Sequence, residues 1–357
     1  MSKLNLCVIF GGVSSEHEVS LISAASVLQH IDQEKYTIHM IYIDKNGGWF
    51  YYDGAISDVA NETDWAGLGL DRAFLSPDRS DHGILRFTDT GVVRIPIDVV
   101  FPVLHGKNGE DGTIQGLFEI AGIPYVGAGV LGSALCMDKC IAKTLFAQAG
   151  IPQADWIELK RGQTPDFEKI EAQLGYPCFV KPANAGSSVG ITKAKNREEL
   201  RRGIEVAFAE DEKLLIEEAV SAREVESSVI GNLHPRCAET LGEIAPAAEF
   251  YDYDAKYNDE NSKLTIPANL DAQTQDAIRA YALQAYQLCE CRGMARVDFF
   301  VDKETGEIKL NELNTLPGFT SISMYPKLWA ASGLAYPALI DELIRYAIER
   351  AQGGTED

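Results

Sequence analysis

A strand–helix–strand pattern at the N-terminus limits the folds open to this chain. Residues 4–10, LNLCVIF, form a continuous apolar run that stops at a glycine pair, which predicts a buried strand. Residues 16–31 have apolar side chains at helical spacing, with Ser14 or Ser15 as the expected N-cap. Residues 36–44 predict a second strand, so the pattern is a βαβ unit and indicates a parallel sheet.

The chain of 357 residues is too long for one small core, and its patterns change twice. A strand at 98–106 and a helix at 113–122 extend the first sheet, whereas 53–95 looks like a polar insertion. One long helix is expected at 131–149, followed by a small α+β region. We predict three domains, at residues 1–127, 128–217 and 218–357.

The overall charge excludes several kinds of partner. The chain has 32 basic and 53 acidic residues, a net charge of −21, which repels nucleic acid and anionic membrane surfaces. No apolar run approaches the ~18 residues of a membrane span, and the N-terminal run is too short for a signal peptide. We expect a cytoplasmic protein with no nucleic-acid or membrane partner. Its seven cysteines lack zinc-site spacing, which favours reduced, mostly buried thiols.

Two predicted strands near the C-terminus, ARVDFFVD and EIKLNELN, are joined by KETG and suggest a hairpin over 295–314. If Asp302 faces Ile308, alternation gives one apolar face and one face with four polar side chains. On that polar face, Asp298 lies opposite Glu312 and Arg296 lies opposite Asn314.

Two directly opposed carboxylates repel each other unless positive charge lies between them. Carboxylate and amide oxygens are hard ligands that suit Mg²⁺ or Mn²⁺ held together with substrate phosphates. A solvated face with a salt bridge is the alternative. We predict a metal site formed by Asp298, Glu312 and Asn314.

A glycine- and serine-rich loop, VKPANAGSSVGI at 180–191, can present successive backbone N–H groups to an anion. It lacks the Walker A pattern, and a plain Gly-Ser hairpin is the alternative. Lys139 and Lys181 are nearby cations that favour phosphate binding. GAGVLG, at 127–132, matches a dinucleotide fingerprint, but the strand before it is short, so we interpret it as a domain hinge.

Two further segments are candidates for ligand contact. GGVSSEHEVS joins the end of a parallel strand to a helix start, where Glu16 could meet an ammonium or simply favour the helix dipole. EFYDYDAKY lies in a long polar stretch, 249–267, which is typical of a lid or of a surface loop with buried tyrosines. Lys256 and Tyr257 are its candidate contacts.

Taken together, these segments resemble the D-alanine–D-alanine ligases of the ATP-grasp superfamily. The resemblance implies an α/β (α+β) three-domain ATP-grasp architecture with an N-terminal Rossmann-like parallel-sheet domain that binds substrate. It also implies that ATP is gripped between the central and C-terminal domains. The matching segments, between residues 11 and 323, are GGVSSEHEVSLISA, HGKNGEDGTIQG, MDK, FVKPANAGSSVGI, LIEEAV, EFYDYDAKY, RVDFF and NELNTLPGFTSIS.

The resemblance also implies how nucleotide is held. Asp298, Glu312 and Asn314 would hold two Mg²⁺ or Mn²⁺ ions that bridge the ATP phosphates. Glu217 would accept from the adenine amino group, and Glu224 would contact the ribose. The implied ATP-binding residues are Lys139, Lys181, Gly186, Ser187, Ser188, Glu217, Glu218, Val220, Glu224 and Lys256.

For the amino acids, Glu16 would bind the ammonium of the first D-alanine, with His105 beside it. Arg296 and the backbone at Gly318 would form the oxyanion site, and Ser323 would hold the second carboxylate. The implied catalytic set is Glu16, Ser187, Tyr257, Arg296, Gly318 and Ser323, and Met324 adds to the substrate contacts.

The implied activity is ATP- and Mg-dependent ligation of two D-alanines through an acyl phosphate, for peptidoglycan precursor synthesis, by a homodimer. Alternatives are an ATP-grasp ligase of the D-Ala–D-Ser or D-Ala–D-Lac type, a non-catalytic nucleotide-binding protein, and an NAD oxidoreductase that uses GAGVLG. Tyr257 resembles the residue of amine-using members.

Overall fold

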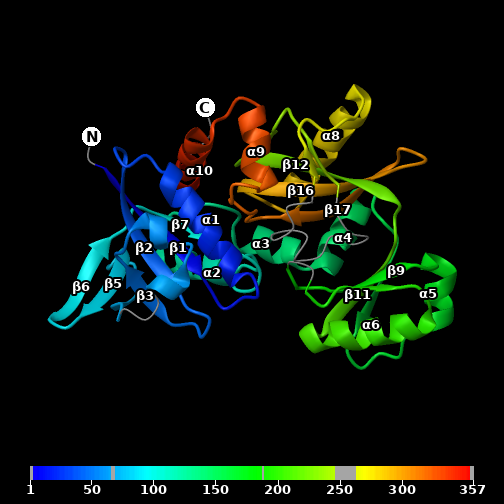
Figure 1. Ribbon diagram of the computed structural model, residues 1–357, viewed down its shortest axis with the longest axis horizontal. Coiled ribbons are helices and arrows are strands. Elements are labelled where there is room, and N and C mark those ends of the chain that lie inside the picture. The colour runs from blue at the N-terminus through cyan, green and yellow to red at the C-terminus, as the bar shows by residue number, and fades with distance from the viewer. Residues whose placement is uncertain (1–2, 66–68, 187–188, 246–262, 354–357) are drawn as a thin grey trace.

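The computed structural model describes residues 3–65, 69–186, 189–245 and 263–353, which form three β-sheets with flanking helices (Figure 1). The N-terminal sheet lies at one end of the long axis and a small four-stranded sheet at the other, with the C-terminal sheet beside helices α9 and α10. The predicted domain boundaries stay a prediction.

The N-terminal sheet has the strand order β6-β5-β4-β3-β2-β1-β7. Parallel pairing joins β1 to β2 and β1 to β7, and α1 connects β1 to β2, which confirms the predicted βαβ unit. The elements are β1 (Leu4–Gly11), α1 (His17–His30), β2 (Tyr36–Ile43), β3 (Trp49–Tyr52), the 3-10 helices η1 (Ile56–Asp58) and η2 (Glu62–Asp64), β4 (Arg72–Leu75), β5 (Gly83–Thr88), β6 (Gly91–Pro96), β7 (Val99–Val103) and α2 (Thr113–Ala121).

Two local predictions in this part were wrong. Most of 53–95 is not an insertion, because β4, β5 and β6 continue the sheet in antiparallel fashion from β3. An antiparallel sheet can leave one face in solvent, so these strands carry many polar side chains. This polarity makes the strands hard to recognise from the sequence. The N-cap of α1 is Glu16 rather than a serine, and the Ser14 hydroxyl accepts a hydrogen bond from the Glu16 N–H at 3.1 Å.

The single helix expected at 131–149 is two helices, α3 (Val130–Met137) and α4 (Lys139–Gln148). Asp138 separates them in an extended conformation, and its carboxylate accepts hydrogen bonds from the N–H groups of Cys140 and Ile141 at 3.1 Å. This N-cap favours a new helix start over continuation of α3. As a result, Lys139 lies at the first residue of a helix.

The small sheet is antiparallel, with the order β10-β9-β11-β8, and packs against α5 and α6. Strand β9 leads directly into the glycine loop predicted at 180–191. The elements are β8 (Trp156–Lys160), α5 (Phe167–Leu174), β9 (Cys178–Pro182), β10 (Thr192–Ala194), α6 (Arg197–Glu210) and β11 (Lys213–Glu218).

The C-terminal sheet has the order β15-β14-β12-β16-β17, with β13 paired to β12. Helix α9 was not expected from the sequence, and β13 and β14 are short strands of two and four residues. The elements are β12 (Ala222–Gly231), β13 (Arg236–Cys237), β14 (Gly242–Ala245), β15 (Lys263–Thr265), α8 (Ala272–Leu288), β16 (Gly293–Asp302), β17 (Ile308–Asn314), α9 (Met324–Ala331) and α10 (Tyr336–Ala351).

One hydrophobic core joins the first and last parts of the chain. It contains buried side chains of β1, α1 and β7 together with those of α9, α10 and the segment before α9. Phe101 of β7 and Phe319 of that segment are in edge-to-face contact. Helix α10 therefore covers part of the N-terminal sheet, as Figure 1 shows. This shared core fixes the N-terminal loops relative to the C-terminal sheet.

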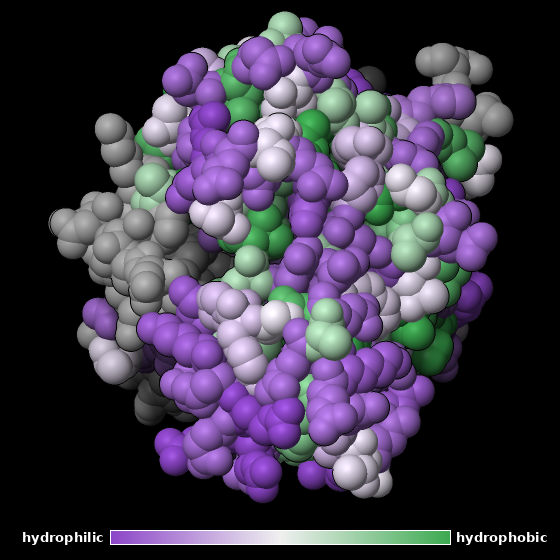
Figure 2. Space-filling model, turned by 90° about the vertical axis from the view of Figure 1, so that its right-hand side faces the viewer, coloured by the Kyte–Doolittle hydropathy of each residue, from purple (hydrophilic) through white to green (hydrophobic). Residues whose placement is uncertain are grey.

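The surface in Figure 2 is dominated by hydrophilic residues, with apolar residues in scattered groups. No helix in the described ranges is long and apolar enough to cross a membrane. All seven cysteines fall in those ranges as free thiols, and all except Cys237 are buried.

Two glycines of GAGVLG, Gly127 and Gly132, lie in close contact with other backbone segments. A Cβ at Gly132, in α3, would lie 3.1 Å from the carbonyl oxygens of Cys289 and Glu290, which follow α8. Gly127 has a positive φ of 99°. A Cβ at Gly293 would lie 3.1 Å from the backbone nitrogen of Gly127. These contacts need small residues whether or not the segment acts as a hinge.

A Gly132→Ala substitution should destabilise the protein, because it crowds backbone atoms that cannot rotate away. Alanine favours a helix more than glycine does, but overpacking outweighs this gain. We therefore expect the free energy of unfolding to fall by about 1 kcal/mol. Gly116→Ala in α2 is the matched control, since no atom lies within 4 Å of the added Cβ, and should stabilise by about 0.5–1 kcal/mol. Urea unfolding measures both; equal stabilisation would contradict the packing argument.

Candidate active site

The site is built on a row of three carboxylates across adjacent strands. In the backbone pairing, Glu226 of β12 lies opposite Asp298 of β16, which in turn lies opposite Glu312 of β17. The next row on the same face contains Ser228, Arg296 and Asn314. Like charges placed directly opposite destabilise a sheet, so this arrangement requires nearby cations.

The register of this hairpin differs from the predicted one at its turn. Ile308 faces Val301 rather than Asp302, and Asn311 forms a β-bulge beside Asp298 and Phe299. The extra residue shifts the register by one. The predicted pairs, Asp298 with Glu312 and Arg296 with Asn314, are therefore correct although the starting pair was wrong.

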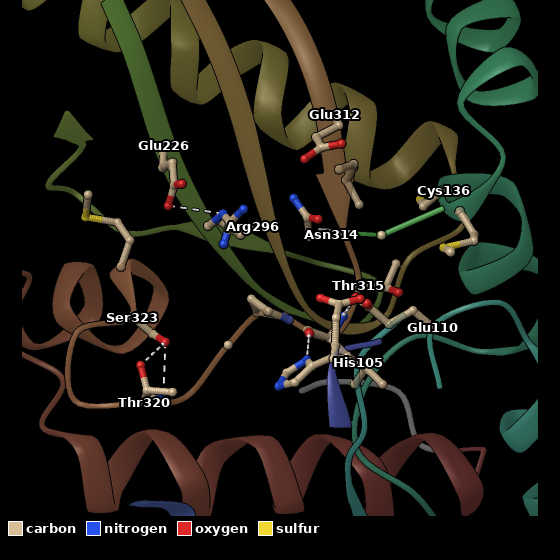
Figure 3. A pocket seen from close by; sticks show the side chains of 18 of the residues that line it. His105, Glu110, Cys136, Glu226, Arg296, Glu312, Asn314, Thr315, Thr320 and Ser323 are labelled. Atoms are coloured by element: carbon tan, nitrogen blue, oxygen red, sulfur yellow. Dashed lines mark hydrogen bonds and ion pairs between the residues drawn. The ribbon is translucent and has the colours of Figure 1, made fainter. Parts of the chain in front are cut away.

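Arg296 balances two of the three carboxylates. Its Nε lies 3.0 Å from Glu226 Oε2 and donates to Asp298 Oδ1 at 2.8 Å, while Nη2 donates to Asp298 Oδ2 at 2.7 Å. Burial alone would lower the pKa of Arg296, but the charges of Asp298 and Glu226 raise it above its ordinary value. Figure 3 shows the guanidinium between Glu226 and the β17 side chains, facing the cavity.

The third carboxylate lies near a lysine. Lys139 Nζ lies 4.0 Å from Glu312 Oε2 and donates to the carbonyl oxygen of Ala185 in the glycine loop at 2.8 Å. Asn314 donates its amide N–H to Asp298 Oδ2 at 3.1 Å. Lys139 thus connects the acidic face to the loop expected to hold phosphate.

The predicted metal ligands are of the chemical kind that a hard divalent cation prefers. Asp298, Glu312 and Asn314 present two carboxylates and one amide on one face of the hairpin. In the described ranges no group of three or more His, Cys, Asp and Glu residues could hold a metal ion. A cation here would need additional oxygens, such as those of a bound phosphate, to complete its coordination.

A cavity opens beside this face and collects side chains from all three parts of the chain. Glu16 and His105 line it from the N-terminal part, the glycine loop contributes Gly186, and the segment after β17 forms its floor. The predicted site residues that line the cavity are Glu16, His105, Lys139, Gly186, Arg296, Glu312, Asn314, Gly318, Ser323 and Met324.

Glu16 is buried at the junction of two loops. A Cβ at Gly106 or at Gly186 would collide with its carboxylate, so both glycines are required for this approach. Gly186 belongs to the glycine loop and Gly106 follows the end of β7. The N-terminal loop and the glycine loop therefore meet at one carboxylate on the cavity wall.

The cavity floor, residues 315–323, is held by N-terminal side chains. His105 Nδ1 lies 3.1 Å from the carbonyl oxygen of Leu316, and its Nε2 lies 3.2 Å from the Ser23 hydroxyl. Glu110 accepts a hydrogen bond from the Leu316 N–H at 3.4 Å and from the Gly106 N–H at 2.6 Å. Both backbone groups of Leu316 are thus bound from the N-terminal part.

At the far end of the floor, Ser323 precedes α9. Its hydroxyl accepts from the Thr320 N–H at 2.9 Å and lies 2.8 Å from the Thr320 hydroxyl (Figure 3). A Cβ at Gly318 would lie 2.8 Å from the Ser323 oxygen, so the glycine keeps this hydroxyl accessible. Met324, the first residue of α9, is buried against Gly242.

Among the described residues, the other predicted nucleotide contacts do not line this cavity. Glu224 and Asp298 line a second, adjoining cavity that shares Glu226, Arg296 and Glu312 with the first. Glu217 and Lys181 form a buried ion pair between β11 and β9. Glu218 pairs with Lys309 at 2.6 Å, and Val220 follows β11. Ser187, Ser188, Lys256 and Tyr257 lie outside the described residues.

Sequence reasoning missed several residues of this site. Glu226 could have been found from the alternation of Glu224 and Glu226, but only the pairing of β12 with β16 places it beside Asp298. Glu110 lies within HGKNGEDGTIQG, yet nothing local to that segment indicates its contact with Leu316. Thr320 and Lys143 gave no distinctive signal, because each acts through a tertiary contact.

Two buried carboxyl groups, Glu16 and Glu110, face each other across the cavity wall. Burial and the negative charge of Glu16 raise the pKa of Glu110 to about 8, although the N–H groups of Gly106 and Leu316 oppose the shift. Burial lowers the pKa of His105, which therefore stays neutral at pH 7.

Comparison with known proteins shows which family this chain is similar to. The family model described as "D-ala D-ala ligase N-terminus" matches residues 5–128, and "D-ala D-ala ligase C-terminus" matches residues 145–345. The D-alanine–D-alanine ligase of Ruminiclostridium cellulolyticum is 52% identical over 365 residues, covering 98% of this chain and 96% of that protein.

Solved structures agree. The VanG D-Ala:D-Ser ligase from Enterococcus faecalis is similar with a TM-score of 0.87 at 40% identity, over 97% of this chain and 100% of that chain. The D-alanine–D-alanine ligase from Bacillus anthracis complexed with ATP gives 0.74 at 30% identity, over 99% of each chain.

The three sheets, with a cavity between the glycine loop and the acidic hairpin face, define an ATP-grasp fold. This chain belongs to the D-alanine–D-alanine ligase family. The fold class and the family predicted from the sequence are thus confirmed.

A Glu110→Gln variant should change the pH dependence of stability. Between about pH 4.5 and 8 the folded wild type keeps a proton on Glu110 that the unfolded chain has lost, so its unfolding free energy falls as pH rises through that window. Glutamine cannot ionise. The unfolding free energy of the variant relative to wild type should therefore rise by up to about 1.4 kcal/mol per pH unit across this window.

Urea unfolding at pH 5 and pH 8.5 measures this difference. Glu304→Gln, the same replacement at an exposed position on the hairpin turn, serves as the control. Parallel pH profiles for wild type and Glu110→Gln would show that Glu110 ionises normally.

Proposed function

We propose that this chain joins two D-alanine molecules to form D-alanyl-D-alanine, with conversion of ATP to ADP and phosphate, in the synthesis of peptidoglycan precursors. The observation that carries the proposal is the acidic face of β16 and β17 beside Lys139, which opens into a cavity lined by Glu16, Arg296 and Ser323. Membership of the family over nearly the whole chain supports it.

The proposed reaction has two steps. The carboxylate of the first D-alanine attacks the γ-phosphorus of ATP, which gives a D-alanyl phosphate and ADP. The free amine of the second D-alanine then attacks the activated carbonyl, and inorganic phosphate leaves with the formerly carboxylate oxygen. Both reactants of the first step are anions, so positive charge must offset their repulsion.

The residues of the cavity have distinct roles in this scheme. Glu16 would bind the ammonium of the first D-alanine, and Ser323 would hold the carboxylate of the second. Arg296 would stabilise the oxyanion of the tetrahedral intermediate together with the backbone at Gly318. Lys139 would neutralise a phosphate oxygen, which its position between Glu312 and the glycine loop supports.

We propose Mg²⁺ or Mn²⁺ as the source of the additional positive charge. Asp298, Glu312 and Asn314 would hold two such ions against the nucleotide phosphates, and bound there the ions would screen the phosphate charge from the attacking carboxylate. Arg296 now occupies both oxygens of Asp298, so this carboxylate would share its lone pairs between the guanidinium and a cation.

Glu312→Gln should abolish most turnover while leaving the fold intact, because it removes one anionic ligand without changing side-chain size. We expect phosphate release with ATP, Mg²⁺ and D-alanine to fall by about 10²-fold or more. Glu307→Gln, at an exposed position just before the same strand, is the control and should retain activity. Unchanged turnover in Glu312→Gln would contradict the metal assignment.

A D-serine acceptor is the second candidate, because the similar VanG protein is a D-Ala:D-Ser ligase. Competition among D-alanine, D-serine and D-lactate at fixed ATP, with products separated by mass, distinguishes the candidates. We expect D-alanyl-D-alanine as the main product; a predominance of D-alanyl-D-serine would favour the second candidate.

We further propose that the enzyme is a cytoplasmic homodimer. Its substrates are ATP and a small amino acid, and its net charge of −21 disfavours contact with nucleic acid or anionic lipid. Light scattering during size-exclusion chromatography measures the subunit number.

A further inference from the structure

A buried carboxylate lies between two lysines at the edge of the proposed nucleotide site. The side chain of Glu217, on β11, is 2% exposed, and its two oxygens have different partners. Lys143 Nζ lies 2.5 Å from Oε1, and Lys181 Nζ bonds Oε2. Lys143 comes from α4 and Lys181 from β9, so the carboxylate is held from two elements.

The two lysines are not equivalent. The Lys143 side chain is 3% exposed, within helix α4, and its backbone carbonyl accepts a hydrogen bond from Gln153 at 2.8 Å. The Lys181 side chain is 13% exposed and also experiences the charges of Glu312 and Glu224, which face the proposed nucleotide. Lys181 can therefore exchange partners, whereas Lys143 is confined beside Glu217.

Both lysines matter for the charge of Glu217. Burial by itself would raise its pKa, but Lys143 and Lys181 together lower it to about 2. The neighbouring Glu218 and Asp138 have lysine partners of their own, because Glu218 bonds Lys309 and Asp138 bonds Lys213. The ionised state of Glu217 thus depends on these two lysines.

Nucleotide binding would disturb this balance if the proposed function holds. Lys181 would move its charge toward the phosphates, and the adenine amino group, a neutral donor, would take its place at Glu217. One cation would then remain to offset the burial of the carboxylate. Without it, a proton would bind Glu217 and weaken its acceptance of the adenine N–H.

We propose that Lys143 is a positioning residue that holds the Glu217 carboxylate, ionised and in place, when nucleotide draws Lys181 away. Lys143 itself touches neither nucleotide nor amino acid. The inference rests on the proposed nucleotide contacts of Glu217 and Lys181, and it assigns to Lys143 a role in ATP affinity rather than in the chemical step.

The test is the pH dependence of nucleotide affinity in a Lys143→Met variant. Binding of a non-hydrolysable ATP analogue with Mg²⁺ is measured by calorimetry from pH 6 to pH 9. The ratio of variant to wild-type Kd cancels the titration of the nucleotide itself. We expect this ratio to reach about tenfold or more at pH 6 and to decline as pH rises, since Glu217 regains its charge.

Three further variants separate this role from a general loss of structure. Lys143→Arg keeps the charge and should restore a flat profile near wild type. In a Glu217→Gln background, Lys143→Met should add little, since no carboxylate remains to titrate. Lys213→Met removes the Asp138 partner at the other end of the α4–β11 contact and should show no such pH dependence.

A constant ratio across the pH range, or an equal effect of Lys143→Met in the Glu217→Gln background, would overturn the inference. The binding measurement needs no D-alanine, so it is independent of turnover. Loss of D-alanine ligation by the wild-type protein would instead count against the proposed function.

Discussion

The repulsion among three in-register carboxylates is the constraint on which this site depends. Glu226, Asp298 and Glu312 occupy one row across β12, β16 and β17, where like charges disfavour the folded sheet. Arg296 offsets two of them and Lys139 approaches the third. The face retains a net negative charge, which suits it to gather divalent cations with a nucleotide rather than to bind phosphate directly.

The rest of the chain arranges three loops around this face. The core shared by the N-terminal sheet, α9 and α10 brings Glu16 and His105 to the floor after β17. The helix break at Asp138 places Lys139 between the glycine loop and Glu312. Each contact joins residues far apart in sequence, so the cavity exists only when all three sheets are assembled.

Residues grouped within one segment could be predicted from the sequence. The βαβ unit, the glycine loop and the polar face of the hairpin each follow from local patterns, and the family resemblance added their order along the chain. The predicted secondary structure was wrong where short strands extend the sheet and where an N-cap residue starts a new helix. The sheet extension at β4–β6 has weak alternation, and a single N-cap residue, Asp138, divides one expected helix in two.

Residues that act across elements could not be predicted. Glu226 becomes part of the site only through the pairing of β12 with β16, and Glu110 only through its contact with Leu316. The importance of Lys143 follows only from its ion pair with the buried Glu217, which the sequence does not indicate. The hairpin register was predicted for the site but not for the turn, because a bulge at Asn311 has no reliable local signal.

The most direct test of the acyl-phosphate mechanism follows carboxylate oxygen from the substrate to the released phosphate. D-alanine labelled with ¹⁸O in its carboxylate is incubated with the enzyme, ATP and Mg²⁺, and the released phosphate is analysed by mass. Labelled oxygen should appear in inorganic phosphate, because the attacking carboxylate oxygen stays on phosphorus when the amine displaces the phosphate. Dipeptide formation with unlabelled phosphate would contradict an acyl phosphate formed at this site.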